Sequence, residues 1–372
     1  MDILAYGMVT ALGTDAATSC AAARAGLVRS RPLDHFRIRS GVTGEAEPVI
    51  AHPVVLLTNG FEGEARLLRL MHGAMADVAS QAGTHGLDLA DAPIYLSLPA
   101  SDRPQSAAEL IADDAVRNTR AERAEAPLDA RGEFVRAARI VSRAAALARW
   151  PQQPELAFLS NAGNAAGIEA LRAAAIDLSS GRCRRAIVIG ADSLLDAATL
   201  NWLQVSARLK CDAVPNGLQP GEAACALLLS AAEPEAAQAR ITKTGVGDEE
   251  ASLDSGRVSS GSGLARALAS ADTGTRDHAP WLLSDHNGET YRASELGHAI
   301  VRLRAQSPRF ASPHIEYPAL AFGDTGAASA LVSIIWAIRA FARGYAPGGP
   351  ALVAATSEGR LRAAASVQAS GT

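Results

Sequence analysis

The sequence predicts an α/β protein made of two similar halves. Short apolar runs that suit buried strands alternate along the 372-residue chain with segments of helical pattern. Two strand–turn–helix units also resemble each other, LAFLSNAGNAAGIEALRAA at 156–174 and ALAFGDTGAASALVSIIWA at 319–337. Each unit places a polar residue in a turn of small residues, and each is followed by two further strand-like runs. This repetition indicates a duplicated fold with its seam near residues 232–240.

The expected strands follow one another in chain order and are short, apolar and bounded by turn residues. They are VVLLT 54–58, IYLSL 94–98, LAFL 156–159, AIVIG 186–190, ACALLL 224–229, WLLS 281–284, ALVAA 351–355 and LRAAASVQ 361–368. The last two form the pair that follows the second unit, as AIVIG and ACALLL follow the first. The chain therefore divides into an N-terminal half, residues 1–232, and a C-terminal half, residues 233–372.

Two segments between the expected elements have a different composition. Residues 101–134 are polar, charge-rich and poor in large apolar side chains, so we expect a solvated excursion or cap on the N-terminal half. Residues 245–263 are rich in glycine and serine, which favours a flexible connection. Neither segment has the apolar content of an independent domain.

Composition excludes several classes of function. With 48% hydrophobic and 20% charged residues, the chain can bury a large core as a globular protein. A net charge of −4 and the absence of a dense Lys/Arg stripe give no electrostatic basis for binding nucleic acid. The N-terminus lacks a secretory pattern, and no stretch has the roughly 18 apolar residues of a membrane span. A cytoplasmic location without membrane association is therefore expected.

The four cysteines have no CxxC pairing or regular spacing, so the sequence suggests neither a zinc site nor a disulfide framework. They are expected to be reduced and mostly buried. No metal and no resident cofactor is expected.

Asn164 is the most informative residue of the chain. It stands in the first turn of an Ala-rich helix, directly after the strand-like run LAFL and a tight turn of small residues. Such a turn presents one side chain at a helix N-terminus, where free backbone N–H groups and the helix dipole stabilise a thiolate or a developing oxyanion. A carboxamide can use those donors, but it cannot attack a substrate.

Taken in order, the motifs resemble the β-ketoacyl synthases of the thiolase superfamily nearly end to end. The start, GMVTALGTDAATSCAAARAGLVRSRPL at 7–33, looks like their opening strand, Val-Thr-x-x-Gly turn and first helix. RLKCDAVPNGLQPGEAACALLL at 208–229 is similar to their Gly-Glu-Gly-Ala stretch before an apolar strand. Their Cys-x-Ser-Gly aligns without a gap with residues 164–167, which puts Asn164 at the nucleophile position. The resemblance implies a five-layer αβαβα fold.

The resemblance also implies two flanking positions, which in active members hold histidines or a histidine and an asparagine. The first falls in SDHNGETYR at 284–292, where Asn287 precedes a glycine and replaces histidine. His286 lies one residue earlier, where a strand-end side chain points to the opposite face, so a structural or surface role is expected for it rather than a rescue of the site.

The second flanking position falls in GDTGAAS at 323–329 and is occupied by Asp324. An ionised Asp324 would repel an enolate or oxyanion, and it could donate a proton only if burial raised its pKa strongly. The alternative is that Asp324 caps the helix that follows, as aspartate favours. A cap and a pocket location are compatible.

With Asn164, Asn287 and Asp324 at the three reacting positions, ordinary condensation is expected to fail. Three functions remain open. The first is a chain-length-factor-like subunit that pairs with an active ketosynthase in fatty-acid or polyketide biosynthesis. The second is an atypical acyltransferase or malonyl decarboxylase acting on acyl thioesters, and the third is a non-catalytic acyl-binding or scaffold protein. Whether the chain is an enzyme therefore stays open.

The resemblance implies partners as well. In the family, the strand before the nucleophile turn pairs across a dimer, so residues 155–162 are the expected dimer strand in a homodimer or in a heterodimer with a ketosynthase. An acyl carrier protein is a possible partner, and its phosphopantetheine arm would be a substrate arm rather than a cofactor of this chain.

Overall fold

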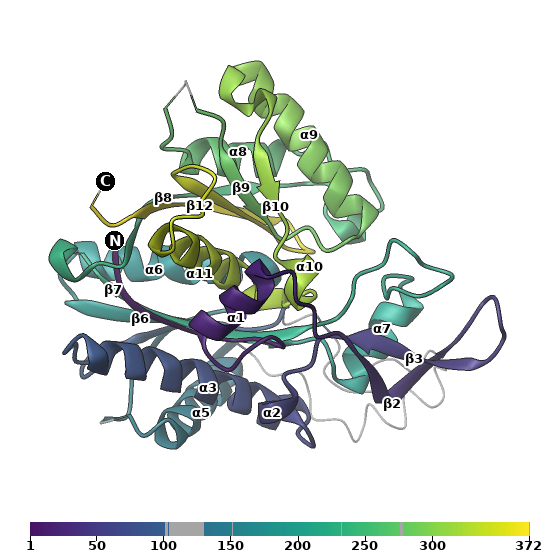
Figure 1. Ribbon diagram of the computed structural model, residues 1–372, viewed down its shortest axis with the longest axis horizontal. Helices are drawn as coiled ribbons and strands as arrows, with labels where there is room; N and C mark the ends of the chain where they lie inside the picture. Colours follow the sequence, from purple (N-terminus) through teal and green to yellow (C-terminus); the bar gives the residue numbers. More distant parts are fainter. Residues whose placement is uncertain (101–102, 104–129, 151, 232, 276–277, 372) are drawn as a thin grey trace.

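The computed structural model describes residues 1–100, 103, 130–150, 152–231, 233–275 and 278–371. Its elements stack in five layers, α, β, α, β and α from bottom to top in Figure 1. The fold class expected from the sequence is therefore confirmed. Ten strands share one sheet in the order β10-β9-β11-β12-β8-β1-β7-β6-β4-β5, and the sheet doubles back between β1 and β8 to form the two sheet layers.

The strands that belong to the first sheet layer are β1 (Asp2–Val9), β4 (Ile94–Ser97), β5 (Leu156–Ser160), β6 (Arg185–Ser193) and β7 (Glu222–Ser230). The second layer holds β8 (Ala239–Asp248), β9 (Trp281–Ser284), β10 (His314–Glu316), β11 (Ala351–Thr356) and β12 (Leu361–Ala369). In the first layer β4 is parallel to β5 and β6, and in the second β9 is parallel to β10 and β11. The pairs β6–β7 and β11–β12 are both antiparallel. The two layers thus repeat one topology.

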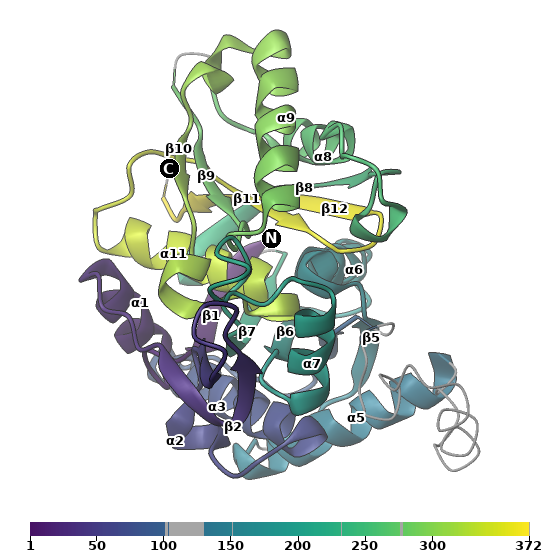
Figure 2. The ribbon, with the colours of Figure 1, turned by 90° about the vertical axis from the view of Figure 1, so that its right-hand side faces the viewer.

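Helices cover both layers and fill the space between them (Figures 1 and 2). The outer helices are α3 (Gly63–Thr84) and α5 (Ala130–Leu147) on one side, and α8 (Ser262–Ala271) and α9 (Thr290–Gln306) on the other. The central layer holds α1 (Ala16–Arg24), α6 (Ala166–Ser179) and α11 (Ser329–Ala342). Both α6 and α11 have 14 residues and follow a three-residue 3-10 turn, η2 (Gly163–Ala165) and η6 (Gly326–Ala328).

Helix α11 packs closely on helix α6 and strand β6 because a glycine of each faces one large side chain. A Cβ atom on Gly167 would lie 3.2 Å from Cγ of Leu331, and one on Gly190 would lie 3.0 Å from Cδ1 of the same leucine. Helix α11 is apolar almost all round, and Leu331, Ile334 and Ile335 are fully buried. A helix of this kind belongs inside a core rather than on a surface.

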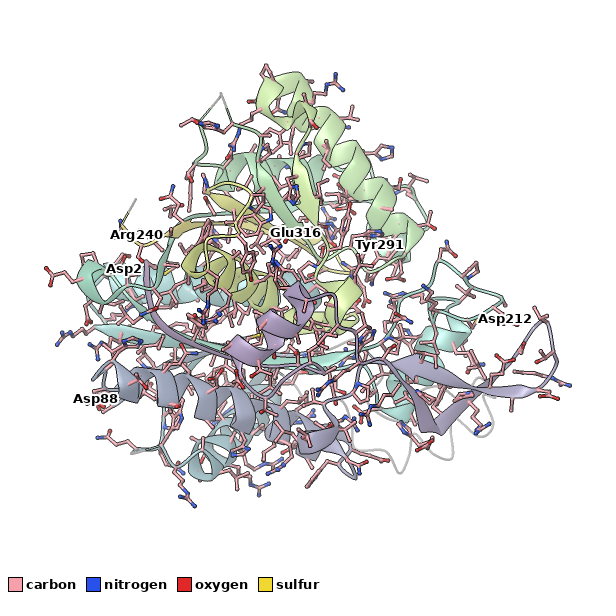
Figure 3. The ribbon with its side chains drawn as sticks, viewed as in Figure 1. Asp2, Asp88, Asp212, Arg240, Tyr291 and Glu316 are labelled. Atoms are coloured by element: carbon pink, nitrogen blue, oxygen red, sulfur yellow. The ribbon has the colours of Figure 1, made fainter. Side chains whose placement is uncertain are left out.

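A small satellite projects from the five layers (right of Figure 1). It consists of the hairpin β2 (Arg31–Arg39) and β3 (Ala46–Ala51), the helix α7 (Ala197–Val205) and the loop 206–221. The apolar cluster beneath them includes Leu33, Leu195 and Leu203. Asp212 fastens the hairpin tip, since it accepts hydrogen bonds from Ser40 Oγ at 2.5 Å and from the backbone N–H of Val42 at 3.0 Å (Figure 3). These bonds lower the pKa of Asp212 to about 2.

The structure corrects three of the expected elements. The run 54–58 forms a short helix, α2 (Val55–Thr58), and the run 319–322 forms α10 (Ala319–Phe322), with the strand β10 just before it. Apolar runs of four or five residues fit a strand and a buried helical turn equally well, so the pattern alone cannot separate the two. The segment 245–263 includes the end of β8, a 3-10 turn at Leu253–Ser255 and the start of α8, so it is more ordered than a flexible connection.

Two other expectations concern the excursion at 101–134 and the division of the chain at residue 232. The excursion at 101–134 lies outside the described residues except for Arg103 and the start of α5. The division at residue 232 stays a prediction; β7 ends at Ser230 and β8 begins at Ala239. Two further 3-10 turns are Pro234–Ala236 and Pro308–Ala311. Within the described part of the chain, no helix combines the length and the apolar character needed to cross a bilayer.

Candidate functional site

Asn164 lies at the centre of η2, between the end of β5 and the start of α6. It is 6% exposed, and Gly163 before it adopts a φ of +68°, which favours glycine. Ser357 holds the turn on both sides, because its hydroxyl donates to the carbonyl of Ala162 and accepts from the N–H of Ala165 at 3.2 Å. The side-chain nitrogen of Asn164 is buried and has no hydrogen-bond partner among the described residues.

Asp324 lies between α10 and η6 and is 4% exposed. Its Oδ1 accepts a hydrogen bond of 2.8 Å from the N–H of Gly326, the first residue of η6, although the N-cap position of η6 itself is Thr325. A second carboxylate shares this helix start, because Oδ2 of Asp192 accepts from the N–H of Ala327 at 2.9 Å. A Cβ atom on Gly326 would lie 2.0 Å from the same Oδ2, so only glycine fits there.

Asn287 lies in the loop between β9 and α9, and the structure brings it against Asp324. Its side-chain nitrogen donates to Oδ2 of Asp324 at 2.6 Å and to Oε2 of Glu289 at 2.9 Å. Its Oδ1 accepts from the N–H of Glu289 at 3.1 Å. Both amide hydrogens are therefore used, and Asn287 has no donor left for a substrate oxygen.

Arg208 continues this line of contacts. Its guanidinium donates to both oxygens of Glu289, at 2.7 and 3.0 Å, and pairs with Oε1 of Glu358 at 2.7 Å. Glu358 follows Ser357, which holds the turn of Asn164. Asp324, Asn287, Glu289, Arg208, Glu358 and Ser357 thus form one chain of contacts from Asp324 to the Asn164 turn, which we call the polar network.

An aromatic ring supports the polar network. The ring of Tyr291 has the guanidinium of Arg208 5.9 Å from its centre and that of Arg292 5.2 Å from its centre (Figure 3). Arg292 in turn donates to Asp285 at 2.9 Å, while the backbone N–H of Thr356 donates to the same carboxylate at 2.7 Å. Burial raises the pKa of Asp285, although Arg292 and Thr356 oppose this. The loop that carries Asn287 is therefore fixed on several sides.

Arg103 belongs to the expected solvated excursion, yet its side chain is only 10% exposed and lies beside the site. It donates to both oxygens of Asp192, at 3.1 and 2.6 Å, and to the carbonyl of Ser193 at 3.3 Å. Burial raises the pKa of Asp192, and the Arg103 guanidinium opposes that rise. Arg103 itself is therefore ion-paired beside the site rather than solvated.

His286 takes no part in the polar network. Its ring lies edge-on to that of Tyr317, with 5.3 Å between the ring centres. Burial lowers the pKa of His286, and its Nδ1 has no hydrogen-bond partner in the described part of the chain. A neutral, packed imidazole agrees with the structural role expected for this residue.

The described part of the site is rich in carboxyl groups, and the cavity beside Asp324 is small. This part of the site holds three guanidinium groups, Arg103, Arg208 and Arg292, and five carboxyl groups, Asp192, Asp285, Asp324, Glu289 and Glu358. An excess of carboxylates opposes the binding of another anion. A cavity beside Asp324 and Asp285 has a volume of about 10 Å³, which is room for about one water molecule.

The four cysteines supply no alternative nucleophile. All are free, and none lies in the η2 turn. Burial raises the pKa of Cys20 to about 12 and raises that of Cys225 as well, so both thiols stay protonated at neutral pH. The described residues hold no group of three or more His, Cys, Asp or Glu side chains that could bind a metal ion.

Sequence reasoning identified Asn164, Asn287 and Asp324 but missed the charged residues around them. Arg208, Glu358 and Arg103 come from distant segments, and no local pattern marks them. A partial signal exists for Glu289, since SDHNGETYR places several polar residues directly after a buried strand. Because nearly all basic residues of this chain are arginines, the sequence does not distinguish the few buried arginines from the exposed ones.

Comparison with known proteins gives a fold and no sequence family. No protein-family model matches the chain, and no curated protein matches it. Among solved structures, "The ishigamide ketosynthase/chain length factor" is similar over 100% of this chain and 99% of its own, with a TM-score of 0.71 and 17% identity. A ketosynthase from module 6 of the bacillaene synthase of Bacillus subtilis 168 is similar over 99% of this chain and 72% of its own, with a TM-score of 0.71 and 11% identity.

A third solved structure is a type II PKS acyl-carrier protein in complex with its ketosynthase bound to the hexaketide. It is similar over 99% of this chain and 98% of its own, with a TM-score of 0.69 and 13% identity. Likeness at such low identity shows a shared fold. The chain therefore has the thiolase-like fold of ketosynthases and chain-length factors.

Proposed function

We propose that this chain is a ketosynthase-like subunit of fatty-acid or polyketide biosynthesis that does not condense acyl groups and that pairs with an active ketosynthase, in the manner of a chain-length factor. The proposal rests on the hydrogen bonds that the side-chain amide of Asn287 makes. Its amide bridges Asp324 and Glu289, so it cannot polarise a thioester or bind an enolate. Together with Asn164 at the nucleophile turn, this removes the two functions that condensation needs.

The position of β5 at the edge of the described sheet supports the pairing. Strand β5 ends the sheet order, and β4 is its neighbour on the paired side. On this edge Ala157 is exposed, and Phe158 and Leu159 are half-buried. An apolar edge strand is normally covered by a partner strand. The heterodimer would form here, as the resemblance implies for residues 155–162.

The fold neighbours suggest which molecules to test. One is named as a ketosynthase/chain length factor, and another is an acyl-carrier protein in complex with its ketosynthase. We therefore propose an active ketosynthase as the direct partner and an acyl carrier protein as the carrier that serves the pair. The phosphopantetheine arm would then react in the ketosynthase subunit.

Co-expression with a ketosynthase and an acyl carrier protein tests the proposal. We expect a ketosynthase heterodimer by size exclusion and native mass spectrometry, and we expect Phe158→Asp to weaken it by at least about tenfold because the charge would be buried at the paired edge. Ile176→Asp, an exposed change on the neighbouring helix α6, is the control. A strictly homodimeric protein that ignores both partners would contradict the proposal.

One observation favours the second function, acyl chemistry without condensation. The buried side-chain nitrogen of Asn164 has no partner among the described residues, so it is free to donate to a thioester oxygen. Incubation of the chain alone with malonyl and acyl thioesters, followed by mass spectrometry, separates the two functions. Unchanged substrates at high protein concentration support the partner subunit, whereas decarboxylation or acyl transfer that Asn164→Ala abolishes supports the enzyme.

A further inference from the structure

Carboxylates flank the edge strand β5 at its end. The strand lies between α6 on one face and α5 on the other (Figure 2). Glu169, in the first turn of α6, accepts a hydrogen bond from the hydroxyl of Ser160, the last residue of the strand. Oε2 of Glu133 on α5 accepts from the side-chain nitrogen of Asn161, the next residue, at 2.7 Å. Both carboxylates are half-buried, so hydrogen bonds hold two negative charges at this end of β5.

The start of β5 carries carboxylates too. A hollow of about 300 Å³ opens beside it, and we call it the β5 hollow. Its lining includes the side chains of Asp91, Trp150, Gln152, Gln153 and Glu155, and no basic residue is among the described residues that line it. Asp91 and Glu155 are exposed, and Trp150 is half-buried. A concavity that joins carboxylates to an indole ring suits a guanidinium or ammonium group.

Basic residues near β5 leave this charge uncompensated. The closest in sequence are Arg131, Arg149 and Arg172, and all three are exposed. Within the described residues, none of them forms an ion pair with the carboxylates at either end of the strand. Two other arginines have carboxylate partners elsewhere, Arg136 with Glu64 and Arg185 with Glu233. Each end of β5 therefore keeps its negative charge.

A second copy of this chain would meet the edge with like charges. Two copies that pair through β5 are related by a two-fold axis, so every contact occurs twice. In an antiparallel pair the start of one strand lies beside the end of the other, which places Glu155 of one copy near Glu133 and Glu169 of the other. A parallel pair would place start against start, again carboxylate against carboxylate. Like charges that face each other across an interface weaken it.

We infer that the edge of β5 selects a different chain over a second copy of this one, and that the partner strand carries a basic residue at each end. One basic side chain would enter the β5 hollow, between the indole of Trp150 and the carboxyl group of Glu155. The other would pair with Glu133 and Glu169. The apolar middle of β5 supplies contact area, and the charges at its ends determine which chain is accepted. The inference rests on the proposed pairing through β5.

The chain studied alone tests the inference by a gain of function. We expect the unaltered chain to be monomeric by sedimentation velocity and native mass spectrometry. Glu155→Lys should tighten self-association by about tenfold or more, because each new ammonium group would lie near Glu133 and Glu169 of the other copy. Raised salt should weaken that homodimer, since exposed charges are screened.

Two matched variants show where the new contact forms. Glu155→Lys/Phe158→Asp should return to the monomer, because it places a charge in the apolar middle of the strand. Glu45→Lys makes the same charge change at an exposed residue between β2 and β3 and should stay monomeric. Thermal unfolding of every variant shows that the fold is kept.

Several results would overturn the inference. They are a homodimer of the unaltered chain, a monomeric Glu155→Lys, a homodimer of Glu45→Lys, and a Glu155→Lys homodimer that Phe158→Asp leaves intact.

Mixing with an active ketosynthase separates this inference from the proposed function. Where the ketosynthase pairs with the chain, Glu155→Lys should weaken the heterodimer by about tenfold or more, and an undiminished heterodimer would overturn the inference. A ketosynthase that ignores the unaltered chain would contradict the proposed function. The homodimer formed by Glu155→Lys would still support charge selection at β5.

Discussion

At the scale of single residues, histidines packed beside the site show how burial sets charge. His52 is fully buried, and its backbone N–H donates to the carbonyl of Pro220 at 2.9 Å. Its ring packs so closely under the loop of Asp324 that a Cβ atom on Gly323 would lie 2.8 Å from it. Burial lowers the pKa of His52, so a neutral imidazole supports this loop.

A pH dependence of stability follows from that shift. Below its unfolded pKa of 6.5, the unfolded chain gains a proton on His52 that the folded chain resists, so the free energy of unfolding should fall as pH drops through 6.5. The slope from this residue is at most about 1.4 kcal/mol per pH unit. Urea unfolding between about pH 7.5 and about pH 5.5 measures it.

His52→Gln should flatten this dependence, whereas His85→Gln, a change at an exposed residue, should leave it intact. Burial lowers the pKa of His72 and His286 too, so part of the slope stays in the variant. If the slope of unfolding free energy against pH is unchanged in His52→Gln, then His52 does not contribute to the pH dependence of stability.

At the scale of elements, glycines set how closely helix α8 approaches strand β8. A Cβ atom on Gly247 would lie 1.9 Å from the carbonyl oxygen of Gly263, and one on Gly245 would lie 2.1 Å from that of Ala267. Backbone groups occupy both positions, so no rotamer change can relieve either contact. The two glycines let the outer helix lie directly on the second sheet layer.

Gly247→Ala should therefore separate β8 from α8 and lower the free energy of unfolding by roughly 3 kcal/mol. Gly297→Ala is the matched control, because Gly297 lies within the exposed face of α9 with nothing within 4 Å of an added Cβ. That change should raise stability by about 0.5–1 kcal/mol through helix propensity. Urea unfolding measures both, and a neutral Gly247→Ala would mean that α8 can shift without cost.

At the scale of the whole molecule, the two halves depend on each other. The sheet joins them through a short register of two residue pairs, Asp2 with Arg240 and Ile3 with Ala239. An ion pair of 2.7 Å reinforces the first pair (Figure 3). Most of the junction is instead the central layer, where the apolar helix α11 packs against α6 and the first sheet.

Residues 1–232 expressed alone should consequently fail to form a compact fold, because the apolar surface that α11 covers would be exposed. We expect aggregation or binding of a hydrophobic dye, and recovery of a soluble complex when residues 233–372 are co-expressed. Circular dichroism and size exclusion measure this. A cooperative thermal transition of the isolated first half would contradict the interdependence.

Much of the fold was predictable because its strands are short, apolar and bounded by turns, as at 186–190 and 351–355. The run 319–322 misled because its apolar residues could equally form one helical turn. Motif alignment predicted the three candidate site positions, Asn164, Asn287 and Asp324. The partners of Asn287 and Asp192 could not, since Arg208 and Arg103 come from other segments and reach them only after folding. Ion pairing between distant residues leaves no periodicity in a sequence.

The side-chain amide of Asn287 donates to two carboxylates, and this makes single substitutions at the site unfavourable. A neutral histidine at 287 would offer one N–H donor where the amide now supplies two, so either Oδ2 of Asp324 or Oε2 of Glu289 would lose its hydrogen bond. Cysteine at 164, added first, would gain a thiol without a base. Each change is thus unfavourable until the others have been made, so a histidine at 287 and a cysteine at 164 would have to be introduced together with changes at Asp324 and Glu289.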